Sequence, residues 1–345
     1  MIDLVSDTIT LPSRAMLGTI LEAQLGDAGR LDMSGRGEDL TTNQLEDMAA
    51  EITGMDAALF FPTGTMANTC AILSYCKPGS TILLETRQHI LTVEKICFQE
   101  DGFRMLPVLY PLKQSGDPDL DIIKRQLVQA KPQLVCLENT HNFSGGKCIS
   151  VRAMQQVKAL CSEYGVPVHL DGARLFNAAE ALGVAPKEIT QHCDSVMFCI
   201  SKGLGAPIGS LLCGSKALIE QAREWRKLLG GTMRQSGVAA ACGIYALQHN
   251  VERLREDREN AQRLAMQLAG MTKLQADPNP QSNILLFNLS KANIDGEYFC
   301  RQLAERGIRG YIVSETEVRL VFHMGITSEE TAYVAEQICA IDRGL

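Results

Sequence analysis

Short apolar runs alternate with amphipathic segments between residues 44 and 250. Runs of this length that are apolar almost throughout predict strands buried on both faces. Such strands need helices on both sides, so the alternation predicts a doubly wound α/β domain with a mostly parallel sheet. The predicted strands are AALFFPTG (57–64), STILLE (80–85), QLVCLENT (133–140), VPVHLD (166–171) and SVMFCI (195–200), and the predicted helices include 43–54, 65–76 and 173–183.

After residue 250 the pattern changes to that of an α+β layer. Residues 251–270 predict a long charged helix, with Val251, Leu254, Ala261, Leu264 and Leu268 on one side. Two strands (282–289 and 317–324) and two helices (295–307 and 328–341) follow, and Thr327 with Glu330 has capping-box spacing. We therefore expect an N-terminal arm and large domain over 1–250 and a small C-terminal α+β domain over 251–345.

Composition excludes several classes of protein. The 345 residues are 46% hydrophobic, which is enough for one large core and a smaller one, and the net charge of −7 argues against nucleic acid or anionic membrane surfaces as partners. No long apolar stretch or secretory leader is present, so we expect a cytoplasmic protein. The 12 cysteines form no Cys-x-x-Cys pair. We expect buried reduced thiols such as Cys70, Cys97, Cys136, Cys199, Cys213 and Cys242, and no metal site.

Two charged residues follow predicted strands. Asp171 ends the strand 166–171, and Lys202 comes just after 195–200, among Gly203, Gly205 and Gly209. Ligands of parallel sheets bind beyond the carboxyl ends of the strands, so both side chains are expected at one rim. Taken singly, Asp171 also fits an ion pair or a helix cap, and Lys202 fits a solvated loop residue.

A third element is the turn FFPTGTMAN, in which Gly64 precedes a helix beginning near Thr65. The free N–H groups of a helix N-terminus suit a phosphate, although strand–Gly–helix junctions are common and the Gly-Lys-Ser/Thr of a Walker loop is absent. Lys202, Asp171 and this turn together fit pyridoxal phosphate (PLP), which needs an amine for its aldehyde, a carboxylate for its pyridine nitrogen and an anion site. Glycines beside Lys202 are expected to let the backbone approach the cofactor closely.

Ordered blocks along nearly the whole chain carry a family resemblance. They are DLVSDTIT, GEDLTTNQLE, FFPTGTMAN, LENTHN, HLDGARLFNAA, CISKGLGAPIGSLLCG, WRKLLGGTMRQSG and VRLVFH. This set resembles the low-specificity L-threonine aldolase family, PLP enzymes of fold type I (the aspartate-aminotransferase fold). The resemblance implies a seven-stranded sheet in the large domain, a small C-terminal domain and a homotetramer built as a dimer of dimers with shared active sites.

The resemblance also implies roles for individual residues. Lys202 matches the Schiff-base lysine and Asp171 the partner of the pyridine nitrogen, while Gly64, Thr65 and Arg234 match phosphate ligands, Arg234 in a neighbouring subunit. Ser6, Arg174 and Arg319 match positions that bind the substrate carboxylate, and an arginine fork suits that ion. His89 matches the imidazole that stacks on the ring, His141 a histidine near the substrate hydroxyl, and Glu94 a further family position. We assign His169 and His323 to structure.

The reaction implied is retro-aldol cleavage of a β-hydroxy-L-amino acid to glycine and an aldehyde, with His141 the first and His89 the second choice of base. Another PLP reaction on the same fold, such as β-elimination, is the alternative, and a PLP-carrying regulatory protein is a third reading. A dinucleotide-binding module would need a Gly-x-Gly-x-x-Gly fingerprint, which is absent.

The chain departs from the family in its N-terminal part. Val5 stands where the family has arginine, Arg36 stands where it has tyrosine, and the loop 26–36 is longer. Arg36, with Arg30, is therefore a candidate for binding a substrate with an additional acidic group. The alternative is that both arginines point to solvent.

Overall fold

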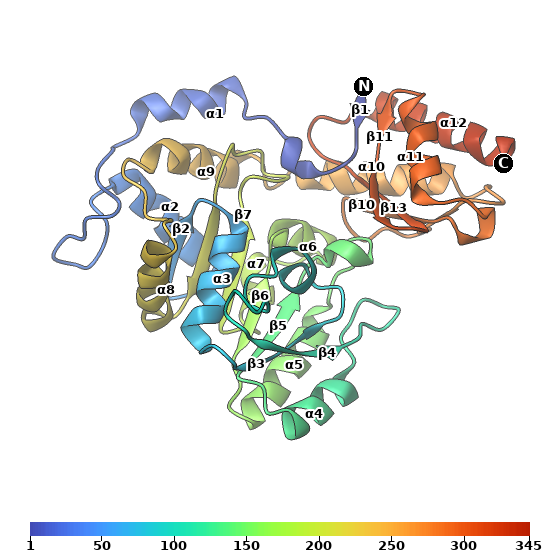
Figure 1. Cartoon of the computed structure of the whole chain (residues 1–345). Helices are drawn as coiled ribbons and strands as arrows, with labels where there is room; N and C mark the ends of the chain where they lie inside the picture. The colour runs from blue at the N-terminus through green and yellow to red at the C-terminus, as the bar shows by residue number, and fades with distance from the viewer.

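A seven-stranded sheet forms the centre of the computed structural model, which describes residues 1–345 (Figure 1). Only β8 runs antiparallel to its neighbours; the other pairs are parallel, as predicted. The chain therefore has the α/β fold of the large domain expected from the sequence. In order across the sheet the strands are β2 (Ala57–Phe61), β8 (Ser210–Gly214), β7 (Ser195–Cys199), β6 (Val168–Asp171), β5 (Leu134–Glu138), β3 (Thr81–Glu85) and β4 (Leu106–Tyr110).

Helices cover both faces of this sheet because both faces are apolar. Along β2, Phe60 packs into the largest core cluster, whereas Leu59 and Phe61 face the opposite side, toward α3 and α8. That is the two-residue period of a strand buried between two layers. The helices of the large domain are α1 (Arg14–Gly18), α2 (Leu40–Thr53), α3 (Gly64–Tyr75), α4 (Leu120–Gln129), α5 (Val151–Glu163), α6 (Leu175–Leu182), α7 (Pro186–Thr190), α8 (Lys216–Leu228) and α9 (Gly237–His249).

The sequence pattern does not predict every element. β4 is an edge strand that contains Pro107 and exposes Leu106 and Leu109, so it lacks the signature of a buried strand. The segment 26–39 is irregular, as expected for a loop, but α2 begins at Leu40 because the Asp39 side chain accepts a hydrogen bond from Thr42 N at 2.8 Å.

The C-terminal residues form a smaller layer with its own core. The predicted charged helix is α10, in which Leu254, Ala261 and Leu264 are buried. The predicted capping box of Thr327 and Glu330 is present at the start of the last helix. An antiparallel sheet in the order β12–β13–β10–β9 is covered by three helices. The elements are α10 (Leu254–Gln267), β9 (Gln275–Ala276), β10 (Ile284–Asn288), α11 (Gly296–Ala304), β12 (Tyr311–Ser314), β13 (Glu317–Val321) and α12 (Ser328–Gly344).

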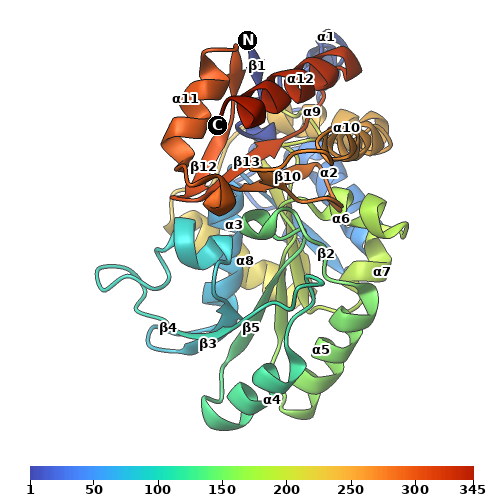
Figure 2. The same ribbon diagram turned by 90° about the vertical axis from the view of Figure 1, so that its right-hand side faces the viewer.

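The N-terminal arm joins the two layers. Its first strand, β1 (Ile2–Asp3), pairs with β11 (Ile308–Arg309), and Ile2 and Leu4 belong to the core of the small domain. The arm then crosses to the large domain, where α1 packs against α9 (Figure 1). Figure 2, turned by 90°, shows the small domain above the carboxyl ends of the central strands. The arm thus passes between the domains next to that rim. The division of the two domains at residue 250 remains a prediction.

All twelve cysteines are free, and the six named from the sequence are buried. Burial raises the pKa of the Cys70 and Cys97 thiols to about 12, which fits inert core residues. None of the helices is long and apolar enough to cross a membrane.

Candidate active site

Carboxylates end three neighbouring strands at one rim of the sheet. Glu85 ends β3, Glu138 ends β5 and Asp171 ends β6, and Glu138 and Asp171 are direct partners in the strand register. All three are almost completely buried. Buried acids need hydrogen-bond donors, so this rim is where the chain concentrates polar groups.

A cavity of about 300 Å³ opens at this rim. Six residues expected from the sequence line it: Ser6, His89, Asp171, Arg174, Lys202 and Arg319. They come from the arm, the large domain and β13. The other lining residues are Val5, Thr8, Val93, Glu138, Thr140, Asn142, Phe143, Ala173 and Tyr311.

Lys202 lies on a loop whose backbone is held at consecutive carbonyls. Thr10 Oγ1 donates to Lys202 O at 2.8 Å, Asn250 Nδ2 donates to Leu204 O at 2.7 Å, and Arg253 Nη1 donates to Gly203 O at 3.4 Å. The glycines of this loop have packing and conformational causes: Gly209 has φ +117°, and a Cβ there would lie 2.4 Å from the Phe60 ring. A close approach of the cofactor, which the sequence led us to expect, is thus not needed to explain why glycine stands at these positions.

Asp171 is held by two donors at one end of the cavity. Its Oδ1 accepts from Ala173 N at 3.0 Å, and its Oδ2 accepts from Asn68 Nδ2 at 3.1 Å. The same Asn68 nitrogen donates to Glu94 Oε1 at 3.0 Å. The carboxylate is therefore fixed in direction before any ligand binds.

His89 lines the cavity and pairs with Glu94, with 3.0 Å between Nδ1 and Oε1. Burial opposes its protonation, but the hydrogen bond to Glu94 and the charges of Asp171, Glu94 and Glu138 raise the pKa of His89. Its ring is also stacked on Phe143, with centroids 6.3 Å apart. These contacts favour the protonated form of the ring.

Arginines gather at the other end of the cavity. Arg174 donates from Nε and Nη2 to both oxygens of Asp7, each at 2.7 Å, and both side chains are buried. Burial opposes ionisation of Asp7, yet Arg174 and the nearby Lys202 lower its pKa to about 2. The fork of Arg174 is thus occupied by Asp7, which the sequence reading did not foresee.

Arg319 has a freer guanidinium. Its Nη1 donates to Asn142 Oδ1 at 2.5 Å, Nη2 donates to Val5 O at 3.3 Å, and the buried Nε has no partner. The guanidinium stacks over the Tyr311 ring at 4.7 Å. Burial and the neighbouring Arg174 lower the pKa of Arg319 to about 10, so it remains a cation that lacks a paired carboxylate. That arrangement suits an anionic ligand.

Gly64 and Thr65 do not line the cavity; they form the first turn of α3, capped by Thr63 Oγ1, which accepts from Met66 N at 3.2 Å. A Cβ on Gly64 would lie 2.6 Å from Met197 Cε and 3.0 Å from Cys199 Sγ. A side chain at position 64 would therefore require the Met197 methyl group to move.

Three other expected residues lie outside the cavity. His141 is buried with Nε2 2.7 Å from Glu85 Oε2, and its Nδ1 has no partner. Burial opposes its charge, but Glu138 and Glu85 raise its pKa. Arg234 is exposed and pairs with Asp27, while Arg36 pairs with Asp47 and donates to Asn43 O. The structure thus does not bring Arg36 to the cavity of its own chain, and Arg30 pairs with Glu38.

Several site residues were missed by sequence reasoning. Asp7, Glu138 and Asn142 lie next to residues or within blocks that had been singled out, and Asn68 lies in the first turns of α3. Asp171 was selected because it is a charged residue at the end of a predicted buried strand. The same criterion applies to Glu138 and could have identified it. Nothing in the pattern marks Asp7 as the partner of Arg174.

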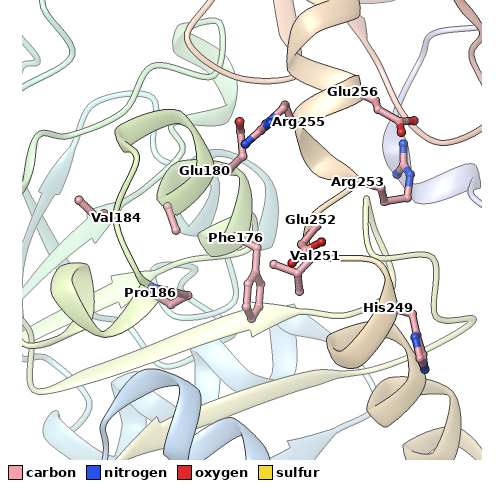
Figure 3. Close-up of a pocket in the computed structure, with 11 residues that line it drawn as sticks. Phe176, Glu180, Val184, Pro186, His249, Val251, Glu252, Arg253, Arg255 and Glu256 are labelled. Carbon is pink, nitrogen blue, oxygen red and sulfur yellow. The ribbon is translucent and has the colours of Figure 1, made fainter.

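A larger cleft of about 790 Å³ lies on another side of the molecule. Figure 3 shows Phe176 and Glu180 from α6, His249 from the end of α9, and Arg253 and Glu256 near the start of α10 around it. Apart from the contact of Arg253 with Gly203, it shares nothing with the rim cavity. Its mixed charges indicate no particular ligand.

The chain was compared with known families and proteins. A family model described as "Beta-eliminating lyase" matches residues 3–290. The chain belongs to this family. Among curated relatives, the "Low specificity L-threonine aldolase" of Escherichia coli (strain K12) is 40% identical over 97% of both chains. "Low-specificity L-threonine aldolase 1" of Arabidopsis thaliana is 35% identical over 96% of this chain and 94% of the relative.

Solved structures confirm the fold. A putative L-allo-threonine aldolase from Listeria monocytogenes superposes with a TM-score of 0.78 at 21% identity, covering 98% of this chain and 96% of that one. A threonine aldolase from Leishmania major gives 0.80 at 17% identity, covering 99% and 100%. The expected fold type I architecture, with its large sheet domain and small C-terminal layer, is confirmed.

Proposed function

We propose that the protein is a PLP-dependent lyase that cleaves β-hydroxy-L-amino acids, threonine among them, to glycine and an aldehyde. The observation that carries this is the convergence of Lys202, Asp171, His89 and Arg319 on one cavity, in a chain 40% identical to a low-specificity L-threonine aldolase over nearly its full length. β-Elimination on the same fold is the competing function, because a fold does not dictate the reaction.

The residues present fit PLP. The cavity holds an amine, Lys202, and a buried, hydrogen-bonded carboxylate, Asp171. Beside it, the N-terminus of α3 approaches the sheet at a glycine that no other residue could replace without moving Met197 or Cys199. We propose that Lys202 holds the aldehyde, Asp171 the pyridine nitrogen, and the amides of Gly64 and Thr65 the phosphate. When bound, PLP supplies an electron sink for the bond broken at Cα.

The protein groups then have separable tasks. Arg319 binds the substrate carboxylate, with Ser6 beside it, while Arg174 acts chiefly by holding Asp7 in place. Fixing the carboxylate and the amine sets the orientation of the Cα–Cβ bond, and such positioning contributes up to roughly 7–11 kcal/mol in the best cases. Asp171 supplies the carboxylate at the place where positive charge must be stabilised.

Proton removal from the β-hydroxyl requires a base within hydrogen-bond reach. His89 lines the cavity, whereas His141 does not and is engaged with Glu85. We therefore place His89 first and give His141 a role through water or through Glu85. In the expected dimer of dimers, Arg234 serves a neighbouring site, and in this chain only its Nη1 is engaged, with Asp27.

Product analysis tests the proposal. Full-length protein with PLP is given L-threonine, L-allo-threonine and an acidic β-hydroxy amino acid, and glycine, aldehyde, 2-oxo acid and ammonia are measured. Glycine with an equal amount of aldehyde supports the aldolase, and 2-oxo acid with ammonia overturns it in favour of elimination. Lys202→Ala is expected to lose nearly all turnover; a variant that keeps it with bound PLP refutes the role of Lys202.

A further inference from the structure

We propose that Asn68 is a positioning residue that holds the Asp171 and Glu94 carboxylates side by side in one arrangement, and that its amide is itself oriented by His169 and Ser195. Asn68 is fully buried on α3, and its Nδ2 donates to Glu94 Oε1 at 3.0 Å and to Asp171 Oδ2 at 3.1 Å. The hydrogen-bond network does not depend on the proposed function. That it positions Asp171 for a pyridine ring does rest on the proposed function.

The direction of the Asn68 amide follows from its neighbours. On one side it meets two carboxylates, which accept hydrogen bonds and cannot both donate to it. An amide oxygen there would face two acceptors, so the nitrogen must point to the carboxylates. The oxygen Oδ1 then points to His169 Nε2, 3.1 Å away.

This direction fixes the tautomer of His169. Because Asn68 Oδ1 is an acceptor, His169 must carry its hydrogen on Nε2. Its Nδ1 lies 2.8 Å from Ser195 Oγ and therefore accepts from that hydroxyl. Burial lowers the pKa of His169 to about 4, so the ring remains neutral and only one tautomer satisfies both contacts. His169 is thus more than a packed core residue, because its ring N–H donates to Asn68 Oδ1 and so holds the amide in this orientation.

The carboxylates need this donor. The ligand atoms of His89, Glu94 and Asp171 all lie within 4.8 Å of one another, and like charges this close repel. The two N–H groups of Asn68 and the ring N–H of His89 lie between them or beside them. Without Asn68, Asp171 Oδ2 loses its only protein donor, and the carboxylate is free to turn or to take a proton.

The first test reads the tautomer without any cofactor. Solid-state ¹⁵N NMR of the full-length, histidine-labelled protein, with His169 signals assigned by their loss in His169→Gln, is expected to show a neutral ring protonated at Nε2. In Asn68→Leu, in which the acceptor is gone, the Nδ1-protonated form is expected to appear. A ring that is charged or protonated at Nδ1 in the wild-type protein overturns the proposal, whether or not the protein is an aldolase.

The second test follows PLP binding by absorbance. Removing a donor to a charged group is expected to weaken PLP binding about 10–150-fold in Asn68→Leu, with a changed absorption spectrum. Ser74→Ala, which removes a surface-side hydrogen bond on the same helix, is expected to leave both unchanged. Wild-type affinity and spectrum in Asn68→Leu overturn the proposal.

A pair of histidine variants keeps the test valid if Asn68→Leu does not fold. The amide nitrogen of Gln reaches the position of His Nε2 and can still donate to Asn68 Oδ1, whereas that of Asn is one bond short. His169→Gln is expected to keep the spectrum and affinity of bound PLP, and His169→Asn to lose affinity by about tenfold or more. Equal behaviour of the two variants means that His169 only fills space, and this overturns the proposal.

Discussion

Around Asp171, the hydrogen-bonding groups come from a single domain: Asn68 lies on α3 and His169 on β6, both in the large domain. At the other end of the cavity, Asp7 comes from the N-terminal arm and Arg319 from the small domain. The first end, the rigid end, is built within the large domain. The second, the assembled end, exists only when the arm, the large domain and the small domain are docked together. Under the proposed function, the rigid end would face the reacting ring, and the assembled end would bind the substrate carboxylate.

Asp7→Asn should break the assembled end most strongly. It leaves Arg174 buried without a charged partner, and loss of one member of a buried pair costs about 3–5 kcal/mol in the free energy of unfolding. Urea unfolding at pH 7 measures this. Asp3→Asn, on the same arm but in a half-exposed pair with Arg309, is the control and should cost about 1 kcal/mol or less. Equal losses would mean that the arm is not held through Asp7.

Asp171→Asn tests the rigid end. The neutral amide cannot balance a positive ring nitrogen, and its nitrogen would compete with the Asn68 donor. We expect kcat to fall about 10²–10³-fold, with a smaller change in KM, at saturating PLP. Steady-state glycine release checks this, with Asp119→Asn, a remote helix cap, as the control. A kcat within a few-fold of wild type would remove Asp171 from the chemistry.

Arg319→Lys probes the carboxylate-binding end without changing its charge. Lysine keeps a cation but loses the planar fork, so kcat/KM should fall about 10–150-fold, mainly through a higher KM. The matched variant Arg309→Lys changes an exposed arginine of the same domain and should have no effect on KM. If kcat falls and KM does not, Arg319 acts on the reacting atoms rather than on binding.

Acid should weaken the assembled end first. The pKa of Asp7 is about 2 in the folded protein against 3.8 for the free group, so its contribution is complete above about pH 4 and is lost as the pH falls toward 2. The loss amounts to about 2 kcal/mol. The difference in unfolding free energy between wild type and Asp7→Asn should therefore be smaller at pH 2.5 than at pH 5. A constant difference would contradict this.

Glu317→Gln should have the smallest effect. Its pair with Arg87, at 2.8 Å, also joins the small domain to the large one, but both side chains reach solvent. We expect a loss below about 1 kcal/mol that disappears at high salt, measured by urea unfolding with and without added NaCl. A larger, salt-independent loss would show that this contact, and not Asp7, carries the docking of the small domain.

Much of the fold and part of the site follow from local pattern. Apolar runs predict buried strands, and a charged residue at the end of such a run is expected at the rim of the sheet. This pattern is what predicts Asp171 and Lys202 as site residues. The edge strand β4 was not found, because its exposed residues and Pro107 lack that pattern. Arg36 was expected near the substrate because it stands where the family has tyrosine, just before the block GEDLTTNQLE, yet its guanidinium pairs with Asp47.

The sequence by itself determined the α/β class, the positions of the main strands and helices, and the residue types that gather at the carboxyl rim, because these depend on period and on near neighbours in the chain. Only the tertiary structure decided which arginine is free. Arg174 and Arg319 look alike in sequence, but Asp7 occupies one fork, and the pairing joins residues 167 positions apart. A contact over that distance depends on how the arm crosses between the domains, and no local pattern encodes that path.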